Sequence, residues 1–282
     1  MNDPAEVAVA AQLACLIEVS APKPGNVSPE RHFHDTRYED FLVSGVAIGP
    51  ALADAGRNSL GTTIRRAVED TRRWTSSNTN LGIVLLLVPL AKAALRSGGT
   101  LRDRVTRVLA ETTVEDAAQV YAAIRHAHPG GLGEAAAEDV SENPTVTLRE
   151  AMALAAERDA IAREYVTNFA LTFEVAVPAL RAAREDGLAW SDAAVDAYLR
   201  LLGSVPDTHI ARKLGRHKAE LVSQQAREVL GAGGTRSEEG RRALARLDTE
   251  LRDPRNRRNP GTTADLTCAA IFVVILEGGW DR

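Results

Sequence analysis

Cysteine is scarce in this sequence. Only Cys15 and Cys268 occur in 282 residues, which excludes a disulfide-stabilised scaffold and a zinc site built from cysteines. Each of the two lies in an apolar stretch of the chain. Both are therefore predicted to be buried free thiols.

The sequence also lacks an excess of either charge. It carries 38 acidic and 34 basic side chains, which gives a formal net charge of −4. This balance excludes a generally basic nucleic-acid-binding protein, although it permits a local cationic pocket. We therefore expect no nucleic acid among the partners.

No hydrophobic run is long enough to cross a membrane. The longest, residues 81–90, is about half of the ~20 residues that a bilayer requires, and residues 269–276 form a shorter one. Both runs are predicted to be helices buried on all sides. The first six residues carry two acids and no base, unlike the cationic start of a signal peptide. We expect a cytoplasmic protein that does not enter membranes.

Aromatic residues make up only 4% of the chain, whereas 45% of residues are hydrophobic and 26% are charged. Ala, Leu, Arg and Glu, which favour helices, dominate, and no run alternates in the manner of a strand. We predict a single compact all-α domain over residues 1–282, with buried central helices. Apolar spacing and end signals predict helices at residues 5–19, 64–75, 81–95, 114–126, 217–230, 238–251 and 263–276.

Two further helix starts are indicated by capping boxes, at residues 36–39 and 147–150. The second box opens a long predicted helix that ends near Gly187, and Ser191 would cap the helix after it. Residues 129–144 are rich in proline, glycine and acids, which predicts a mobile loop or a lid.

Residues 22–29 read Pro-Lys-Pro-Gly-Asn-Val-Ser-Pro and form the first segment with reactive side chains. The two prolines beside Lys23 hold the backbone extended and would expose the ammonium group, while Gly25 permits a tight turn. With Asn26 and Ser28 nearby, such a loop would hold a phosphate through Lys23 and backbone amides. The alternative is a rigid connector between helices. The bare pattern favours the connector, because it lacks the spacing of a phosphate-binding loop.

His34 and Asp35 directly precede the helix start predicted at residues 36–39. Amides and the dipole at such a start favour bound anions and stabilise a carboxylate. Asp35 is therefore a candidate ligand of Mg²⁺ or a candidate base, and Asp40, one turn further on, would face the same space. The alternative is that His32 and His34 are solvated loop residues and Asp35 only assists the cap, and the segment by itself favours this alternative.

Amide side chains mark two further positions. Thr79 and Asn80, followed by Gly82, stand at the mouth of the most apolar predicted helix, where more polar groups gather than one cap requires. Asn168 is predicted in the middle of the long helix, beside core positions. A buried asparagine needs partners, so Asn168 is either a structural bridge or a substrate contact.

The densest set of reactive side chains comprises Asp207, His209, Arg212 and Lys213. If this segment is helical, the set would bind a metal triphosphate and move a proton; the alternative is an exposed charged turn. Asp265 falls in the first turn of the last predicted helix, where the helix dipole favours an acid. This structural role is enough to explain an acid at this position without any function in binding or catalysis.

Five segments match, in chain order, one known family: Glu18-Val19-Ser20, Pro22-Lys23-Pro24-Gly25 with Val27-Ser28-Pro29, Asp35 leading to Phe41-Leu42 and Ser44, Thr79-Asn80-x-Gly82, and Pro260-Gly261-x-x-Ala264-Asp265-Leu266. On these residues the chain resembles the triphosphoribosyl-dephospho-CoA synthase family. The match covers essentially the whole length. The Pro-Lys-Pro-Gly block and the Pro-Gly-x-x-Ala-Asp-Leu block are the most specific, and nearly the entire chain separates them.

The resemblance implies an all-helical enzyme that takes ATP and 3′-dephospho-CoA as substrates. Such enzymes release adenine and join C1 of the ATP ribose to the 2′-hydroxyl of dephospho-CoA, which makes the prosthetic-group precursor of an acyl carrier protein. Many members carry His-Lys-Gly where this chain has Asn80-Leu81-Gly82, so one cation is absent here. An alternative is therefore ribosyl transfer to another acceptor, in the biosynthesis of one-carbon carrier cofactors.

The resemblance also implies roles for the candidate residues. Asp35 or Asp207 would be the base or the carboxylate that stabilises an oxocarbenium-like state, and the other, with Asp40, would bind Mg²⁺. His209 or His34 would protonate adenine. The implied ATP-binding residues are Lys23, Gly25, Asn26, Ser28, Thr79, Asn80, Gly82, Asn168, Arg212, Lys213 and Asp265.

Two other classes compete with this interpretation. An all-α metal-dependent phosphohydrolase would use the doublet of His34 and Asp35 together with Asp207, and would release phosphate without adenine. A non-catalytic helical binding protein would turn over no nucleotide. The sequence leaves the oligomeric state open.

Overall fold

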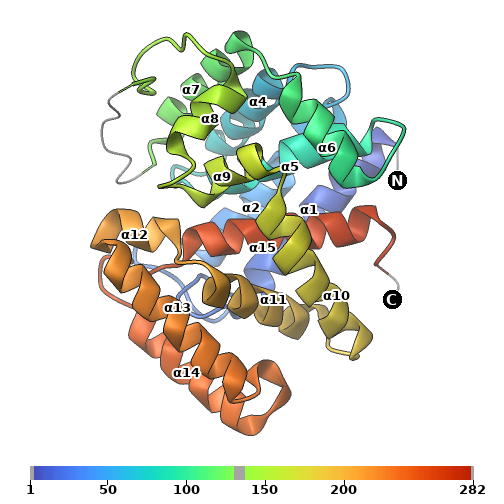
Figure 1. Ribbon diagram of the computed structural model, residues 1–282. Coiled ribbons are helices and arrows are strands. Elements are labelled where there is room, and N and C mark those ends of the chain that lie inside the picture. Colours follow the sequence, from blue (N-terminus) through green and yellow to red (C-terminus); the bar gives the residue numbers. More distant parts are fainter. Residues whose placement is uncertain (1–2, 130–136, 281–282) are drawn as a thin grey trace.

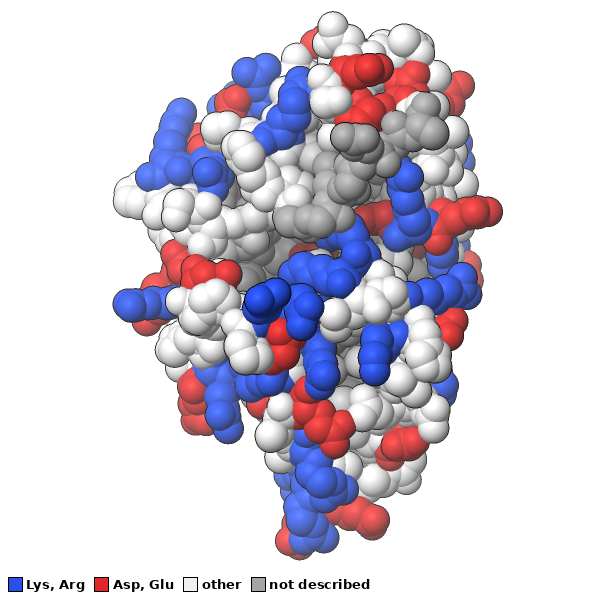
Figure 2. All heavy atoms as spheres, turned by 90° about the vertical axis from the view of Figure 1, so that its left-hand side faces the viewer, with Lys and Arg blue, Asp and Glu red and all other residues white. Residues whose placement is uncertain are grey.

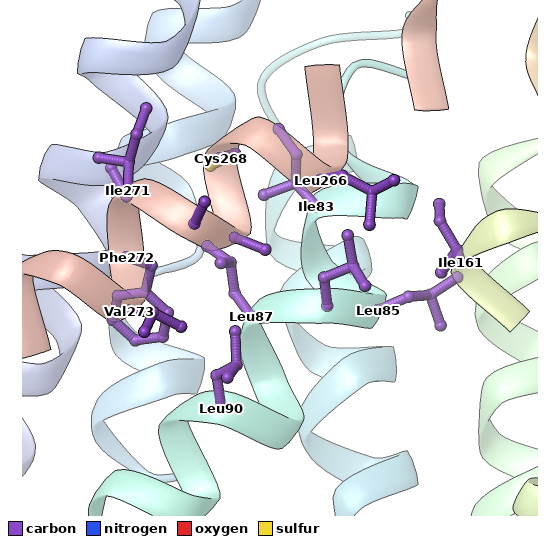
Figure 3. Packing of buried hydrophobic residues seen from close by; sticks show 14 of the residues in the cluster. Ile83, Leu85, Leu87, Leu90, Ile161, Leu266, Cys268, Ile271, Phe272 and Val273 are labelled. Atoms are coloured by element: carbon purple, nitrogen blue, oxygen red, sulfur yellow. The ribbon is translucent and has the colours of Figure 1, made fainter. Parts of the chain in front are cut away.

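Two nearly all-apolar helices form the centre of an all-α fold. The computed structural model describes residues 3–129 and 137–280. In α5 (Leu81–Ala94) every residue except Gly82 and Lys92 is buried, and in α15 (Gly261–Leu276) every residue except Gly261 and Asp265 is buried. Figure 3 shows Leu87 of α5 beside the side chains of α15 that it packs against. Because these helices are apolar all round, they are stable only when other helices surround them.

The surrounding helices come from the whole length of the chain. They are α1 (Pro4–Ser20), α2 (Tyr38–Ala47), α3 (Gly49–Ala53), α4 (Leu60–Arg72), α6 (Leu101–Ala110), α7 (Val114–Ala127), α8 (Leu148–Ala155), α9 (Ala160–Thr167), α10 (Val177–Glu185), α11 (Trp190–Ser204), α12 (Thr208–Leu214), α13 (Arg216–Gly231) and α14 (Glu238–Leu251). A π-helical turn, η1 (Leu171–Ala176), precedes α10, and a short 3₁₀ helix, η2 (Gly234–Arg236), precedes α14. Within the described residues, the β-structure is limited to one isolated bridge between Ser28 and Arg31.

These helices form two groups on either side of α15 (Figure 1). Helices α4 to α9 pack on one side, and α10 to α14 pack on the other. Helix α1 lies along α15 and also contacts α5 and α11, so it belongs to both groups. Buried side chains from α1 through α15 share one hydrophobic core. None of the helices in the described ranges has both the length and the apolar character that crossing a bilayer requires.

Most of the predicted helices are confirmed, and 238–251 is confirmed at both ends. The capping box at residues 147–150 is also confirmed, because Thr147 and Glu150 bond each other's backbone amides. Both cysteines are buried free thiols, as predicted, and their sulfur atoms lie 3.8 Å apart between α1 and α15.

Several helix starts differ from the prediction, and α4 begins at Leu60, four residues before its predicted start. Helix α2 begins at Tyr38, because the Arg37 amide donates to the Asp40 carboxylate at 2.8 Å, so the box predicted at residues 36–39 is shifted. Helix α11 begins at Trp190, before the predicted cap Ser191. Helix α6 was not predicted, although Thr100 opens it with a complete capping box.

The long helix predicted from residue 147 to Gly187 is wrong, because the helix breaks after Ala155, where Asp159 caps the next helix, and again after Thr167. Asn168 and Phe169 both adopt left-handed backbone angles, with φ of 54° and 58°. The buried Glu164 carboxylate then accepts hydrogen bonds from the amides of Leu171 and Thr172, at 2.9 and 3.0 Å, and from the Thr172 hydroxyl at 2.6 Å. Asn168 therefore ends α9 and does not lie in the middle of a helix.

The predicted lid is only partly described. Residues 130–136 lie outside the described residues. Residues 137–144 follow as a loop, where the Tyr121 hydroxyl donates to the Glu138 carbonyl at 2.8 Å. A lid role for residues 129–144 stays a prediction.

We expect Glu164→Ala to destabilise the fold by roughly 3 kcal/mol, because two buried amides and one hydroxyl lose their acceptor. Urea denaturation followed by circular dichroism measures the change. Glu185→Ala, which removes an exposed carboxylate from α10, is the control and should change the free energy of unfolding by less than about 0.5 kcal/mol. Equal effects of the two substitutions would contradict the role of Glu164.

Candidate active site

A cavity of about 960 Å³ opens between the two groups of helices. Its wall combines the ends of α1, α5, α9, α12 and α15 with inward sides of α7 and α8 and the loop after α14. This volume is near the upper end of the range for small-molecule sites. On the face of the molecule that carries α12, lysine and arginine side chains gather across the middle (Figure 2). The arrangement is that of a site for a large, anionic small molecule.

Asp265 and Gly82 meet on the cavity wall, where α15 crosses α5. A β-carbon at Gly82 would overlap the Oδ2 atom of Asp265 and would lie 2.7 Å from the side chain of Ile161. Only glycine at this position lets the carboxyl group lie against the first turn of α5. Gly82 therefore acts by making room for Asp265.

The carboxyl group of Asp265 is electrostatically exceptional. Neither oxygen takes part in a hydrogen bond or ion pair with any described residue, although the side chain is only partly exposed. Burial raises the pKa of Asp265 well above its usual value, and the nearby acids Glu18, Asp207 and Asp159 raise it further. Burial without a partner is typical of a carboxyl group that acts on a ligand, since it is costly in a purely structural role.

Glu18 is a site residue whose only signal in the sequence is its place in the Glu18-Val19-Ser20 motif. It is 4% exposed, lines the cavity and forms an ion pair with Lys23 at 2.9 Å. The Lys23 ammonium also donates to the carbonyls of Glu18 and Ala21 and is 1% exposed. The prediction that the loop exposes Lys23 is therefore wrong. Lys23 compensates a buried acid and does not reach the cavity.

Of the other residues in the loop around Lys23, some contact neighbouring parts of the fold and others line the cavity. Gly25 has φ of 74°, and its amide donates to Asp248 at 2.9 Å. Asn26 lines the cavity, and its amide group donates to the Tyr198 hydroxyl at 2.9 Å. Ser28 pairs with the backbone of Arg31 and does not line the cavity.

Asp207 joins α12 to α15. Its Oδ1 atom caps α12 by accepting from the Ile210 amide at 3.0 Å, and its Oδ2 atom accepts from the amide and the hydroxyl of Thr263 at 2.8 and 2.7 Å. The side chain is 2% exposed and does not line the cavity. The Asp40 carboxylate likewise accepts hydrogen bonds, from the Arg37 amide and from the Thr75 hydroxyl, the latter at 2.8 Å. Neither carboxylate is brought to the cavity.

His209 does line the cavity, where it packs against Gly261 so closely that a β-carbon there would overlap the Nδ1 atom of the ring. Burial, together with the cations Lys213 and Arg212, lowers the pKa of His209 to about 3. The imidazole is therefore neutral at pH 7. In this state it can donate and accept hydrogen bonds, but it carries no extra proton.

Cations border the cavity on the side of α12. Arg212 lies 3.6 Å from the Asp159 carboxylate, and burial followed by the charge of Arg212 lowers the pKa of Lys213. The other arginines on the wall are Arg158, Arg163, Arg216 and Arg255. Cations held this close repel one another, so an anion that binds among them relieves that repulsion.

Asp35 lies at the rim of the cavity, against the loop after α14. It accepts a hydrogen bond from Asn256 at 3.1 Å and lies 3.6 Å from the imidazole of His34. Both side chains are about 60% exposed, and His34 itself does not line the cavity. Sequence reasoning missed the contribution of Asn256, which is 221 residues away along the chain.

Thr79 and Asn80 line the cavity beside Gly82. The Thr79 hydroxyl bonds that of Ser44 at 2.5 Å, and the Asn80 amide group donates to Thr71 at 2.9 Å. Neither side chain caps α5. Asn168 does not line the cavity, and its side-chain oxygen lies 3.5 Å from Arg149. Of the two roles considered for Asn168, the structural one matches this position.

The residues of the wall fit a metal ion only if a ligand supplies most of its oxygen atoms. Among the described residues, no three His, Cys, Asp or Glu side chains are grouped closely enough to hold a metal ion. Mg²⁺ in nucleotide enzymes is commonly held by one or two carboxylates together with phosphate oxygens. The exposed carboxylate of Asp35, close to Lys213, is suited to such a shared site.

Comparison with known proteins gives one consistent family. A family profile described as ATP:dephospho-CoA triphosphoribosyl transferase matches residues 4–282. A crystal structure from Archaeoglobus fulgidus, described as a triphosphoribosyl-dephospho-CoA synthase, is similar with a TM-score of 0.66 and 29% identity, over 84% of this chain and 99% of that one.

Curated relatives align over a shorter part. The 2-(5″-triphosphoribosyl)-3′-dephosphocoenzyme-A synthase of Klebsiella pneumoniae is 36% identical over 104 residues, which are 37% of this chain and 36% of the relative. A protein of Pseudomonas syringae pv. tomato with a corresponding description is 34% identical over 117 residues, 41% of this chain and 40% of the relative. The matched part thus spans about two fifths of these relatives' length.

The raised pKa of Asp265 predicts a pH-dependent effect on stability. An acid whose pKa is higher in the folded state than in the unfolded state stabilises the fold less as pH rises above about 4. Asp265→Asn should therefore raise the melting temperature by roughly 2–4 °C at pH 8, and this gain should vanish near pH 4. Thermal denaturation across this range measures it, with Glu185→Gln as the control for net charge. A gain that is the same at every pH would contradict the prediction.

Proposed function

Because the chain belongs to the ATP:dephospho-CoA triphosphoribosyl transferase family, we propose that it transfers the 5-triphosphoribosyl group of ATP to the 2′-hydroxyl of 3′-dephospho-CoA. Adenine would leave, and the product would be the prosthetic-group precursor of an acyl carrier protein. The observation that carries this proposal is the unpartnered carboxyl group of Asp265, which lines a large cavity bordered by cations. A cytoplasmic location, where ATP is available, belongs to the same proposal.

The proposed reaction breaks the bond between the ribose C1 atom and adenine and forms a bond from C1 to the acceptor oxygen. The acceptor hydroxyl must lose a proton, and the departing adenine must gain one. We assign the first step to Asp265, since a carboxylate with a raised pKa is a stronger base than a solvated one. Its negative charge would also stabilise the oxocarbenium-like state at C1. Asp265 thus takes the role first considered for Asp207, whose oxygens are engaged with Ile210 and Thr263.

The cations on the side of α12 are proposed to hold the triphosphate. Arg212 and Lys213 project from α12 onto the cavity wall, and Arg216 and Arg255 lie nearby on that wall. Arginine forms bidentate hydrogen bonds with phosphate, and lysine adds a point charge. Asp35 would complete the binding of Mg²⁺ shared with the phosphates. The ion would neutralise phosphate charge and fix the orientation of the chain of phosphates.

The polar groups at the start of α5 are proposed to hold the nucleoside. Asn26, Thr79 and Asn80 line the cavity there, and Phe33 and Phe41 supply aromatic surface on the same wall. Neutral His209 would form a hydrogen bond to the ribose or to the base. The proton that adenine needs would come from solvent at the rim, because His209 is neutral and His34 does not line the cavity.

One observation favours a second acceptor. The resemblance to the family implies histidine and lysine where this chain has Asn80 and Leu81, so this wall would have one cation fewer beside the reacting centre. A less anionic acceptor hydroxyl, as in a one-carbon carrier cofactor, would fit this change. The ATP half of the reaction is the same in both cases.

We expect the protein, incubated with ATP, Mg²⁺ and 3′-dephospho-CoA, to release adenine and form the triphosphoribosyl adduct. Liquid chromatography with mass spectrometry detects both products. Asp265→Asn should lower the rate at least ~100-fold, because the base is lost. Adenine without the adduct would indicate another acceptor, and phosphate without adenine would indicate a phosphohydrolase. A fully active Asp265→Asn variant would remove the role assigned to Asp265.

We expect Arg212→Gln to raise the KM for ATP by roughly tenfold, because one charge-assisted hydrogen bond to phosphate is lost. The KM is obtained from initial rates of adenine release at varied ATP concentration. Lys218→Gln is the matched control, since it removes an exposed cation from the neighbouring α13 that does not line the cavity. An equal rise in the control would mean that only the overall charge of the surface matters.

A further inference from the structure

The cavity has an apolar side to which the proposed reaction assigns nothing. On this side α7 and α8 contribute the six side chains that we name the apolar pouch: Val120, Tyr121, Ile124, Leu148, Met152 and Leu154. Among the described residues, those of α7 and α8 that line the cavity are all uncharged. The cations on the wall come from the turn between α8 and α9, from α9 itself, from α12 and α13, and from the loop after α14. The cavity is therefore divided into a cationic side and an apolar side.

The apolar surface continues to the reacting centre through Ile161. This residue lines the cavity at the start of α9, and its side chain lies against Gly82 at the position where Gly82 meets Asp265. A molecule bound in the apolar pouch can thus be continuous with one whose hydroxyl group reaches Asp265. Helices α7, α8 and α9 lie together above α12 in Figure 1.

Two acids at the edge of the pouch are engaged elsewhere. The Glu138 carboxylate accepts from the amide and the hydroxyl of Thr145, the former at 3.0 Å, and the Asp139 carboxylate accepts from Ser141 at 2.9 and 2.7 Å. The Tyr121 hydroxyl donates to the backbone of this loop. The pouch therefore offers mainly aliphatic surface, and its hydrogen-bonding groups are already used.

We propose that the apolar pouch binds the pantetheine arm of dephospho-CoA and so determines which acceptor is used. This inference rests on the proposed function. ATP has no uncharged aliphatic part, and its purine is better served by the amides and aromatic rings at the start of α5. The arm of dephospho-CoA is long, flexible and uncharged, and it gains free energy by leaving water for an aliphatic surface. The cavity volume of about 960 Å³ is large for a single nucleotide and leaves room for this second molecule.

The test compares two acceptors that differ only in the arm. Dephospho-CoA is compared with the β-methyl ester of adenosine 5′-diphosphate, which keeps the nucleoside, the 2′-hydroxyl and the charge of the diphosphate diester. Titration calorimetry gives the dissociation constant of each, and rates of adenine release give kcat/KM. We expect wild-type protein to bind dephospho-CoA at least roughly tenfold more tightly than the methyl ester.

Two substitutions place polar groups in the pouch with little risk to folding. Leu154 is 57% exposed and Ile124 is only partly buried, so Leu154→Glu and Ile124→Asn should leave the core intact. Each should weaken dephospho-CoA binding by roughly tenfold and leave the methyl ester unchanged. Val166→Glu is the matched control, because Val166 is an exposed apolar residue of α9 that does not line the cavity.

The outcomes separate this inference from the function on which it rests. Equal affinity of the wild-type protein for the two acceptors overturns the pouch assignment, as does an equal loss for both acceptors in the variants. Selective loss for dephospho-CoA supports it, even where no adenine is released. Absence of adenine with tight, arm-dependent binding would overturn the proposed reaction and leave the binding site in place.

Discussion

The close contact of α5 and α15 is the constraint on which the rest of the site depends. Both helices are buried almost completely, and the exceptions that line the cavity are Gly82, Asp265 and Gly261, of which the first two face each other. Without a side chain at Gly82, the most hydrophobic part of the core can hold a carboxyl group at its edge, out of reach of other protein donors. The apolar helices that stabilise the fold are thus the same ones that perturb the acid.

Other buried polar groups hold the elements around this contact. Asp207 joins the start of α12 to Thr263 of α15, so the cations of α12 have a fixed position relative to Asp265. Lys23 pairs with Glu18 and keeps a second acid buried beside the cavity. Each of these groups is satisfied, whereas Asp265 is not. The site therefore consists of one unsatisfied acid within a set of satisfied ones, in a cavity that the cations of α12 also line.

The sequence was sufficient for most helices and for the family, because apolar spacing and end signals act locally and the motif blocks are specific. It failed where a side chain's partner lies elsewhere in the fold. Lys23 was expected to be exposed because prolines flank it, yet Glu18 holds it in the core. Asp207 looked reactive, and its partner Thr263 is 56 residues away. The importance of Asp265 was hidden because the helix predicted from residue 263 placed this acid in the first turn, where the helix dipole would account for it. Helix α15 begins at Gly261 and has no acid in its first turn, so that explanation is wrong.

The contact of α1 with α15 gives the fold a particular order of assembly. These helices lie side by side, although nearly the whole chain separates them (Figure 1). During synthesis α15 leaves the ribosome after every helix that it packs against. The apolar surfaces of α1 and α5 that α15 covers therefore stay exposed until α15 has been made. Contacts this distant in sequence slow folding and leave such surfaces open to aggregation or to chaperones. A ribosome-bound chain that stops before α15 would lack both the centre of its core and its acid, so the protein gains its stability and its cavity in one late step.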